Sequence, residues 1–293
     1  MRRLVLFVVL ATSASFTLPQ IASAAVPKCF GKKATIVGTT KADHLKGTAK
    51  ADVIVGLGGS DVIKGLGRSD LICGGNGSDK LIGGDRGDAL VGEAGNDTLS
   101  GGGGLDGLYG GAGNDTFNGG TGFDLASYFF APSSVQVDLT AGTATGGEGT
   151  DTLTGIEDIE GSRFDDTLTG NSGENFFFPG EGNDTVNGGG GTTDRVDFFF
   201  SLNAVVVDLT AGTATGEGTD TLTGIGQVFG SQHDDTITGD ANANTLLGGP
   251  GNDTVSGAAG DDTLDGGDGT DTLDGGLGTD TCTTGETVTN CEA

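Results

Sequence analysis

Apolar residues recur at every ninth position over long stretches of this chain. From Gly38 the sequence divides without a gap into nine-residue units, for example GLGGSDVIK at 56–64 and GEAGNDTLS at 92–100. The eighth position of ten successive units carries Leu45, Ile54, Ile63, Ile72, Leu81, Leu90, Leu99, Leu108, Phe117 and Ala126. One apolar side chain per nine residues predicts one short strand per unit, joined to the next strand by a turn.

The first six positions of each unit are rich in Gly, which permits the positive φ values of tight turns. A strand of about three residues that buries a single aliphatic side chain cannot be stable alone. Stacking successive coils about 4.8 Å apart would pair the strands in parallel and align the Leu and Ile side chains in a column. The pattern therefore predicts an all-β solenoid.

The sixth position of the unit is Asp in ten consecutive units from Asp43 to Asp124. A middle run supplies Asp166, Asn175 and Asp184, and a last run beginning at Gly230 continues the phase from Asp235 to Asp280, with Asn244 at the second place. Stacked turns would align these carboxylates in columns, which repel one another unless a cation lies between them. The alternative is that each Asp only caps its own turn, which leaves the stacked charge uncompensated.

These units resemble the GGxGxDxUx nonapeptide of the RTX (haemolysin-type) calcium-binding proteins. The match is nearly letter for letter at 74–79, 110–115, 248–253, 266–271 and 275–280. The resemblance implies a parallel β-roll, a β-helix-like solenoid with two nonapeptides per coil and turns alternating between two edges. It also implies several Ca²⁺ ions between turns stacked on one edge, held by the sixth-position Asp and by backbone carbonyls, which are the hard oxygen donors that Ca²⁺ prefers.

With two units per coil, partners on one edge belong to every second unit, as Asp61 and Asp79 do. The metal ligands expected from the resemblance are Asp43, Asp52, Asp61, Asp70, Asp79, Asp88, Asp97, Asp106, Asp115, Asp124, Asp166, Asp184, Asp235, Asp253, Asp262, Asp271 and Asp280.

The fourth position of the unit should be Gly, because the turn there is expected to need positive φ. On one edge of the first run it is instead Lys50, Arg68 and Arg86. These cations either compete with Ca²⁺ for the neighbouring carboxylates or point into solvent, and the sequence leaves both interpretations open.

Two segments interrupt the period and copy each other. DLTAGTATG occupies 138–146 and 208–216, and GEGTDTLTGI follows at 147–156 and 216–225. Alternation at 135–139 predicts a strand, so each segment is interpreted as a longer-stranded insert in the roll. The Phe clusters at 128–130, 176–178 and 198–200 either pack in the core or form an exposed binding patch. The phase slips at Asp194, ten residues after Asp184.

The N-terminus is typical of a secretory signal peptide, with Arg2 and Arg3, an apolar run and a small-residue cleavage pattern ending at Ala24. The expected organisation is a signal peptide at 1–24, an N-terminal cap at 25–37, a first repeat run at 38–127, an insert at 128–160, a middle run at 161–193, a second insert at 194–229, a last run at 230–283 and a C-terminal cap at 284–293.

Four Cys allow three pairings. Local pairing of Cys29 with Cys73 and of Cys282 with Cys291 would staple both ends of the mature chain in an oxidising compartment. A metal site is the alternative, but no C-x-x-C and no neighbouring His supports it.

The 14 Lys and Arg against 41 Asp and Glu give a net charge of −27, which opposes binding to nucleic acid and to anionic membranes. No segment is long and apolar enough for a membrane span. The sequence has no H-E-x-x-H and no G-x-S-x-G, and His44 and His233 lie in repeat turns, so no enzyme is expected. The sequence therefore favours a secreted calcium-binding protein; the alternative is an extracellular adhesion or interaction module that uses the Phe-rich inserts. No protein or glycan partner is identified.

Overall fold

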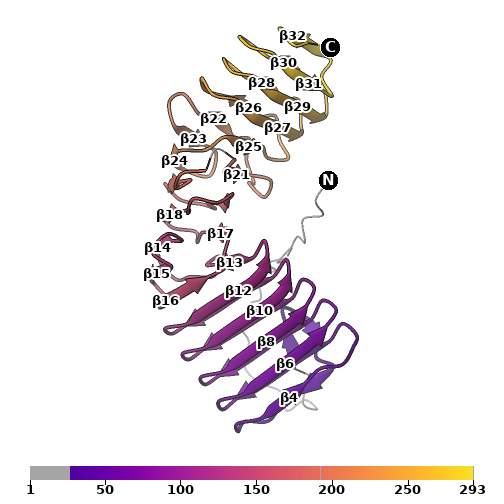
Figure 1. Ribbon diagram of the computed structural model, residues 1–293, viewed down its shortest axis with the longest axis vertical. Helices are drawn as coiled ribbons and strands as arrows, with labels where there is room; N and C mark the ends of the chain where they lie inside the picture. The colour runs from indigo at the N-terminus through magenta and orange to yellow at the C-terminus, as the bar shows by residue number, and fades with distance from the viewer. Residues whose placement is uncertain (1–26, 192, 293) are drawn as a thin grey trace, which may run out of the picture. The chain divides into compact units, whose positions relative to one another are not determined.

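The computed structural model describes residues 27–191 and 193–292 as strands and turns (Figure 1). The predicted signal peptide at 1–24 lies outside the described residues. Within the described part, no helix has the length and apolar character needed to cross a membrane. The chain divides into two compact units, Met1–Asp124 and Leu125–Ala293.

In the first unit, successive nonapeptides alternate between two parallel sheets. Figure 1 shows the strands of one of these sheets lying side by side, labelled β4, β6, β8, β10 and β12. That sheet contains β4 (His44–Lys46), β6 (Val62–Gly67), β8 (Lys80–Asp85), β10 (Thr98–Gly104) and β12 (Thr116–Gly122). The other contains β3 (Ile36–Val37), β5 (Val53–Gly58), β7 (Leu71–Asn76), β9 (Ala89–Ala94) and β11 (Gly107–Ala112).

The eighth-position side chains form the core between the two sheets. In one sheet Ile54 pairs in register with Ile72, Ile72 with Leu90 and Leu90 with Leu108. All four side chains are fully buried, as are Ile63, Leu81, Leu99 and Phe117 of the other sheet. This register places two nonapeptides in each coil, as the resemblance to the RTX proteins implies, and the predicted parallel β-roll is confirmed.

The N-terminal residues form an antiparallel pair, β1 (Lys28–Cys29) with β2 (Lys32–Lys33), which packs on the outer face of the first roll. Cys29 is disulfide-bonded to Cys73 of β7 and lies in an apolar cluster with Val55, Leu71 and Val91. The hairpin therefore covers apolar side chains that point away from the roll interior.

In the second unit one parallel sheet contains β13 (Leu125–Ser127), β17 (Asp158–Glu160), β19 (Phe176–Phe178), β21 (Arg195–Asp197), β25 (Gln227–Phe229), β27 (Thr245–Pro250), β29 (Thr263–Asp268) and β31 (Thr281–Thr283). The opposite side contains the parallel strands β18 (Thr167–Thr169), β20 (Thr185–Asn187), β26 (Thr236–Thr238), β28 (Thr254–Ser256), β30 (Thr272–Asp274) and β32 (Thr287–Thr289). Here too each repeat strand pairs with the strand two nonapeptides further along the chain, as Leu246 pairs with Leu264.

The inserts add antiparallel strands to the roll. The first forms β14 (Val135–Asp138), β15 (Thr143–Gly146) and β16 (Gly149–Thr154), and the second forms β22 (Val206–Asp208), β23 (Thr213–Thr215) and β24 (Thr219–Thr223). The first strand of each meander then pairs in parallel with a repeat strand, β14 with β18 and β22 with β26. The predicted strand at 135–139 is thus confirmed, and each insert is joined to the repeats that follow it.

The Phe clusters divide between core and surface. Phe177 is fully buried and Phe198 is nearly so, whereas Phe130 and Phe200 are more than two-fifths exposed at equivalent places in the two inserts. The second disulfide, between Cys282 and Cys291, joins β31 to the C-terminal residues. Both predicted cysteine pairings are therefore present.

Candidate metal centre

The sixth-position Asp residues form hydrogen-bonded columns along both edges of the roll. The backbone N–H of Asp61 donates to Oδ1 of Asp79, and that of Asp79 donates to Oδ1 of Asp97, each at 2.7 Å. On the other edge the N–H of Asp70 donates to Oδ1 of Asp88 at 2.7 Å. The same contact joins Asp43 to Asp61, Asp97 to Asp115, Asp52 to Asp70, Asp88 to Asp106, Asp106 to Asp124, Asp166 to Asp184, Asp235 to Asp253, Asp253 to Asp271, Asn244 to Asp262 and Asp262 to Asp280.

The second carboxylate oxygen of many of these residues is buried without a hydrogen-bond partner. Each of the side chains concerned is no more than 3% exposed. Twelve described residues share this state of Oδ2: Asp61, Asp70, Asp79, Asp88, Asp97, Asp106, Asp184, Asp194, Asp253, Asp262, Asp271 and Asp280. Burying a carboxylate oxygen without a donor or cation is strongly unfavourable, so this repeated arrangement calls for a positive partner.

Most of these oxygens lie near a backbone carbonyl oxygen of another coil, across the first Gly of their own turn. A Cβ placed on Gly56 would lie within 3 Å of both Oδ2 of Asp61 and the carbonyl oxygen of Gly74. Among the described residues, no three His, Cys, Asp or Glu side chains converge on one point. A cation held here would therefore draw on backbone carbonyls as well as Asp, a set of hard oxygen donors that fits Ca²⁺.

The local environment raises the pKa of the stacked carboxyls. Burial raises the pKa of Asp88 and Asp106 to about 7 and that of Asp97 to about 6, with neighbouring carboxylates adding to the effect and a backbone N–H opposing it. In the second unit burial raises the pKa of Asp184 to about 8. Ionising the columns without a cation is thus unfavourable in the folded roll.

Four of the expected ligands differ from the rest. Oδ2 of Asp52 accepts hydrogen bonds from the N–H and hydroxyl of Thr48 in its own turn, at 2.7 and 2.8 Å. Asp43 has the same arrangement with Thr39, Asp166 with Ser162 and Asp235 with Ser231, in the last two cases with the hydroxyl donating to Oδ1. For these four residues the structure shows the turn-capping arrangement.

Two Asp residues of the columns fall outside the expected ligand set. Asp194 is fully buried and its Oδ1 accepts the N–H of Asn175, 19 residues away, because the turn before it contains one extra residue. Asp220 of the second insert accepts the N–H of Asp184 through Oδ1 at 3.0 Å. The phase slip hides Asp194 from a search at nine-residue spacing. Asp220 could have been found, because TDTLTG at 219–224 copies the end of a nonapeptide.

The fourth position has the positive φ that the sequence predicts in the six-residue turns with a buried free Oδ2. Arg68 and Arg86 adopt φ values of 79° and 78°, in the region where Gly59 and Gly77 also lie. A side chain in this region costs roughly 1 kcal/mol, so these two turns tolerate strain that Gly avoids.

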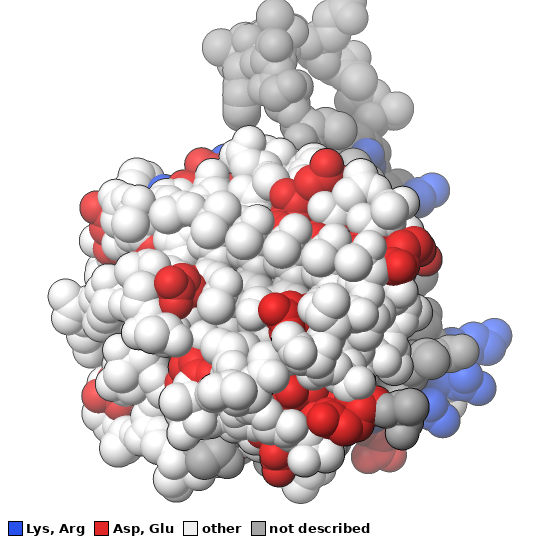
Figure 2. Space-filling view, turned by 90° about the horizontal axis from the view of Figure 1, so that it is seen from above, with Lys and Arg blue, Asp and Glu red and all other residues white. Residues whose placement is uncertain are grey.

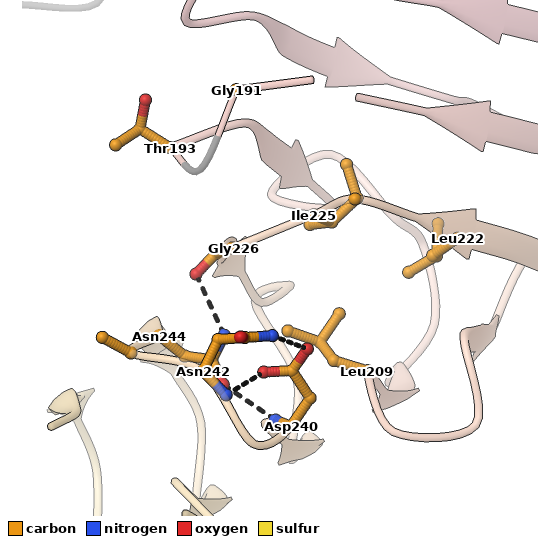
Figure 3. Close-up of a pocket in the computed structure, with 11 residues that line it drawn as sticks. Gly191, Thr193, Leu209, Leu222, Ile225, Gly226, Asp240, Asn242 and Asn244 are labelled. Carbon is orange, nitrogen blue, oxygen red and sulfur yellow. Dashed lines mark hydrogen bonds between the residues drawn. The ribbon is translucent and has the colours of Figure 1, made fainter. Parts of the chain in front are cut away.

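A pocket in the second unit lies over the turn 239–244 (Figure 3). Its walls include Leu209, Leu222 and Ile225, and its lining residues contain no His, Cys or Lys. On the face shown in Figure 2, Asp and Glu side chains form several separate patches, while Lys and Arg lie at the margin.

Comparison with protein families gives one assignment. The model of the RTX calcium-binding nonapeptide repeat matches residues 37–72, 74–108, 91–126, 153–186, 160–193, 229–264 and 247–282, which together span more than half of the chain. No curated protein matches the sequence.

Proposed function

This chain belongs to the family of the RTX calcium-binding nonapeptide repeat, and we propose that it is a secreted protein whose roll is completed by several Ca²⁺ ions in its stacked turns. The observation that supports this most directly is the series of buried Asp Oδ2 atoms with no donor. A divalent cation supplies the positive charge that allows these carboxylates to be ionised at neutral pH.

The proposed ligands are the sixth-position Asp residues of the turns whose fourth position has positive φ, together with backbone carbonyls. They are Asp61, Asp70, Asp79, Asp88, Asp97, Asp106, Asp115, Asp124, Asp184, Asp253, Asp262, Asp271 and Asp280, and the structure supports adding Asp194. Because each carboxylate lies between two coils, an ion there would tie neighbouring coils together. Calcium binding is then coupled to folding of the roll.

Secretion is supported by the predicted signal peptide and by the two disulfides, which persist in oxidising compartments. Removal of residues 1–24 takes away Arg2 and Arg3 and leaves 12 basic against 41 acidic side chains, a net charge of −29. A chain with this charge is expected to be largely unfolded until calcium binds.

Equilibrium dialysis of the mature protein against calcium, with circular dichroism on the same samples, tests this function. We expect several ions per chain and a rise in β-sheet signal with calcium but not with magnesium, which demands a more rigid octahedral site. A protein that binds no calcium at millimolar concentration, or whose spectrum in chelator equals that in calcium, would refute the proposal.

A second candidate function is an extracellular interaction module. Phe130 and Phe200 are exposed at equivalent places in the two inserts, each packed edge to face on the preceding Phe. The paired variant Phe130→Ser with Phe200→Ser should keep the calcium-bound spectrum of the parent while losing attachment to cell surfaces or matrix. Equal attachment of variant and parent would remove this candidate.

A further inference from the structure

The repeat turns fall into two conformational classes. In the six-residue turns with a buried free Oδ2, positions two and four both have positive φ, as in Leu57 with Gly59 (82° and 104°) or Gly249 with Gly251 (104° and 154°). The lengthened turn before Asp194 has positive φ at Gly189 and Gly190 instead. In the turns that end at Asp43, Asp52, Asp166, Asn175, Asp235 and Asn244, neither position has positive φ. We call the first class open turns and the second class closed turns.

Closed turns share one hydrogen-bond pattern that starts from the residue at position two. The N–H of Thr48 donates to Oδ2 of Asp52, while the N–H of Lys50 donates to the hydroxyl of Thr48 at 3.1 Å. In Figure 3 the N–H of Asn242 likewise donates to Oδ1 of Asp240, and the N–H of Asp240 donates to Oδ1 of Asn244, each at 2.8 Å. The position-two residues of all six closed turns are Thr39, Thr48, Ser162, Asn171, Ser231 and Asp240.

Only a short side chain with an oxygen can accept the position-four N–H in this way. Open turns carry Gly, Leu, Ala or Glu at position two, and there the position-four N–H of Gly77 donates instead to the carbonyl of Ala94 in the next coil, at 2.7 Å. The identity of one residue thus selects between satisfying the sixth-position oxygen within the turn and leaving it free.

The closed turns occupy a fixed place in the sequence. Each of the three runs of repeats begins with two of them, one on each edge, and the turns that follow in the run are open. In two of the three pairs the second turn ends in Asn, and the amide of Asn175 donates to the carbonyl of Glu157 at 2.8 Å. A neutral amide used as a donor has no need of a cation.

We propose that the residue at position two decides whether a turn binds calcium, and that the first coil of each run is built of closed turns that fold without metal. This inference rests on the proposed calcium-binding function of the open turns. It assigns Asp43, Asp52, Asp166 and Asp235 to turn capping, and it places the first calcium-binding turn of each run at its third repeat.

The inserts extend two of these metal-free coils. The N–H of Val135 in the first insert donates to Oδ1 of Asp166, and that of Val205 in the second donates to Oδ1 of Asp235, each at 2.7 Å. Val135, Val137, Leu153 and Leu168 are buried together with their counterparts in the second copy. Residues 128–175 and 198–244 therefore have both a core and satisfied turns without calcium.

Counting bound calcium in variants of the full mature chain tests the role of position two. Gly75→Thr with Gly77→Lys gives turn 74–79 the pattern of turn 47–52 and should lower the number of bound ions although no carboxylate is removed. The reciprocal change, Thr48→Gly with Lys50→Gly, should add a site. Asp52→Asn is the matched control and should bind as many ions as the parent, because Asn175 and Asn244 already serve in closed turns.

Several results would overturn the inference. They are an unchanged ion count in the Gly75→Thr, Gly77→Lys variant, a loss of ions in Asp52→Asn, and no gain in the reciprocal variant. If the first variant fails to fold by circular dichroism, the reciprocal variant and Asp52→Asn still decide the question.

Hydrogen exchange measured first in chelator and then in calcium supplies a second test, which does not depend on counting ions. Amides of 128–175 and 198–244 should exchange more slowly than those of 56–124 and 248–280, and calcium should then protect the latter. Uniform exchange along a chain that binds calcium would refute this inference alone. A chain that binds no calcium would refute the proposed function, whatever its exchange pattern.

Discussion

Replacing Gly74 with Ala should disable one calcium site without changing its ligands. A Cβ at this position would lie within 3 Å of Oδ2 of Asp79 and 3.0 Å from the carbonyl oxygen of Gly92. These are the two kinds of oxygen between which we place the ion. The added methyl group therefore fills the space that the cation and its ligands need.

The cost can be estimated from overpacking. Inserting a methyl group into a close-packed site costs roughly 1–3 kcal/mol. If that cost falls on the calcium-bound state, affinity at this site falls roughly 5- to 150-fold. Gly67→Ala is the matched control, because no atom lies within 4 Å of a Cβ at Gly67 and its φ is not in the left-handed region; its affinity should stay within about twofold of the parent, as for most surface substitutions.

Isothermal titration calorimetry with calcium on the parent and both variants makes the comparison, and circular dichroism at saturating calcium shows whether each variant is folded. If Gly74→Ala binds calcium as tightly as Gly67→Ala and the parent do, the ion does not lie beside Gly74. If both variants bind calcium equally weakly, the effect of Gly74→Ala is not specific to the site beside Asp79.

Three other predictions follow from the same structure. Burial raises the pKa of Asp88 and Asp106 to about 7, whereas the pKa of Asp in an unfolded chain is about 4, so the stability of the folded calcium-free chain should fall as pH rises from about 4 to about 7. Circular dichroism in chelator should show more β-sheet at about pH 5 than at about pH 8, and the reverse order would contradict this prediction. Cys29→Ser with Cys73→Ser opens a 44-residue loop and should lower the free energy of unfolding by roughly 4 kcal/mol. Replacing both Cys282 and Cys291 with Ser opens a loop of only 9 residues and should lower it by roughly 2.5 kcal/mol, and denaturant melts in calcium measure both values. Leu90→Ala removes a fully buried side chain between Ile72 and Leu108 and should cost about 2–5 kcal/mol in the same assay, whereas exposed Leu202→Ala should cost far less.

Much of this fold could be predicted from the sequence because the repeat is strict. The nine-residue period predicts which side chain faces inward, and the two units per coil implied by the RTX resemblance then place Ile54, Ile72, Leu90 and Leu108 in one column. The alternation of edges likewise follows from two units per coil, and it places Asp61 against Asp79. A one-residue error in register would have turned the buried side chains outward.

The two classes of turn could not be foreseen from the sixth position, because Asp52 and Asp61 have the same residue type and phase. The two turns differ four residues earlier, where one has Thr48 and the other has Leu57. The N–H of the residue at position four donates to the Thr48 hydroxyl in the first turn, and Leu57 offers no such acceptor in the second. The antiparallel strands of the inserts were also hidden. Their pairing depends on the Gly142 and Gly212 turns, each with φ of 68°, and has no repeat period to reveal it.

The most direct test of the central claim is a crystal structure of the mature protein grown in calcium, with an anomalous difference map at a wavelength where calcium scatters. We expect a peak about 2.3–2.6 Å from Oδ2 of Asp79, on the side of the Gly92 carbonyl, and equivalent peaks beside the other open turns. Ordered water without anomalous signal at these oxygens, in crystals saturated with calcium, would contradict the account.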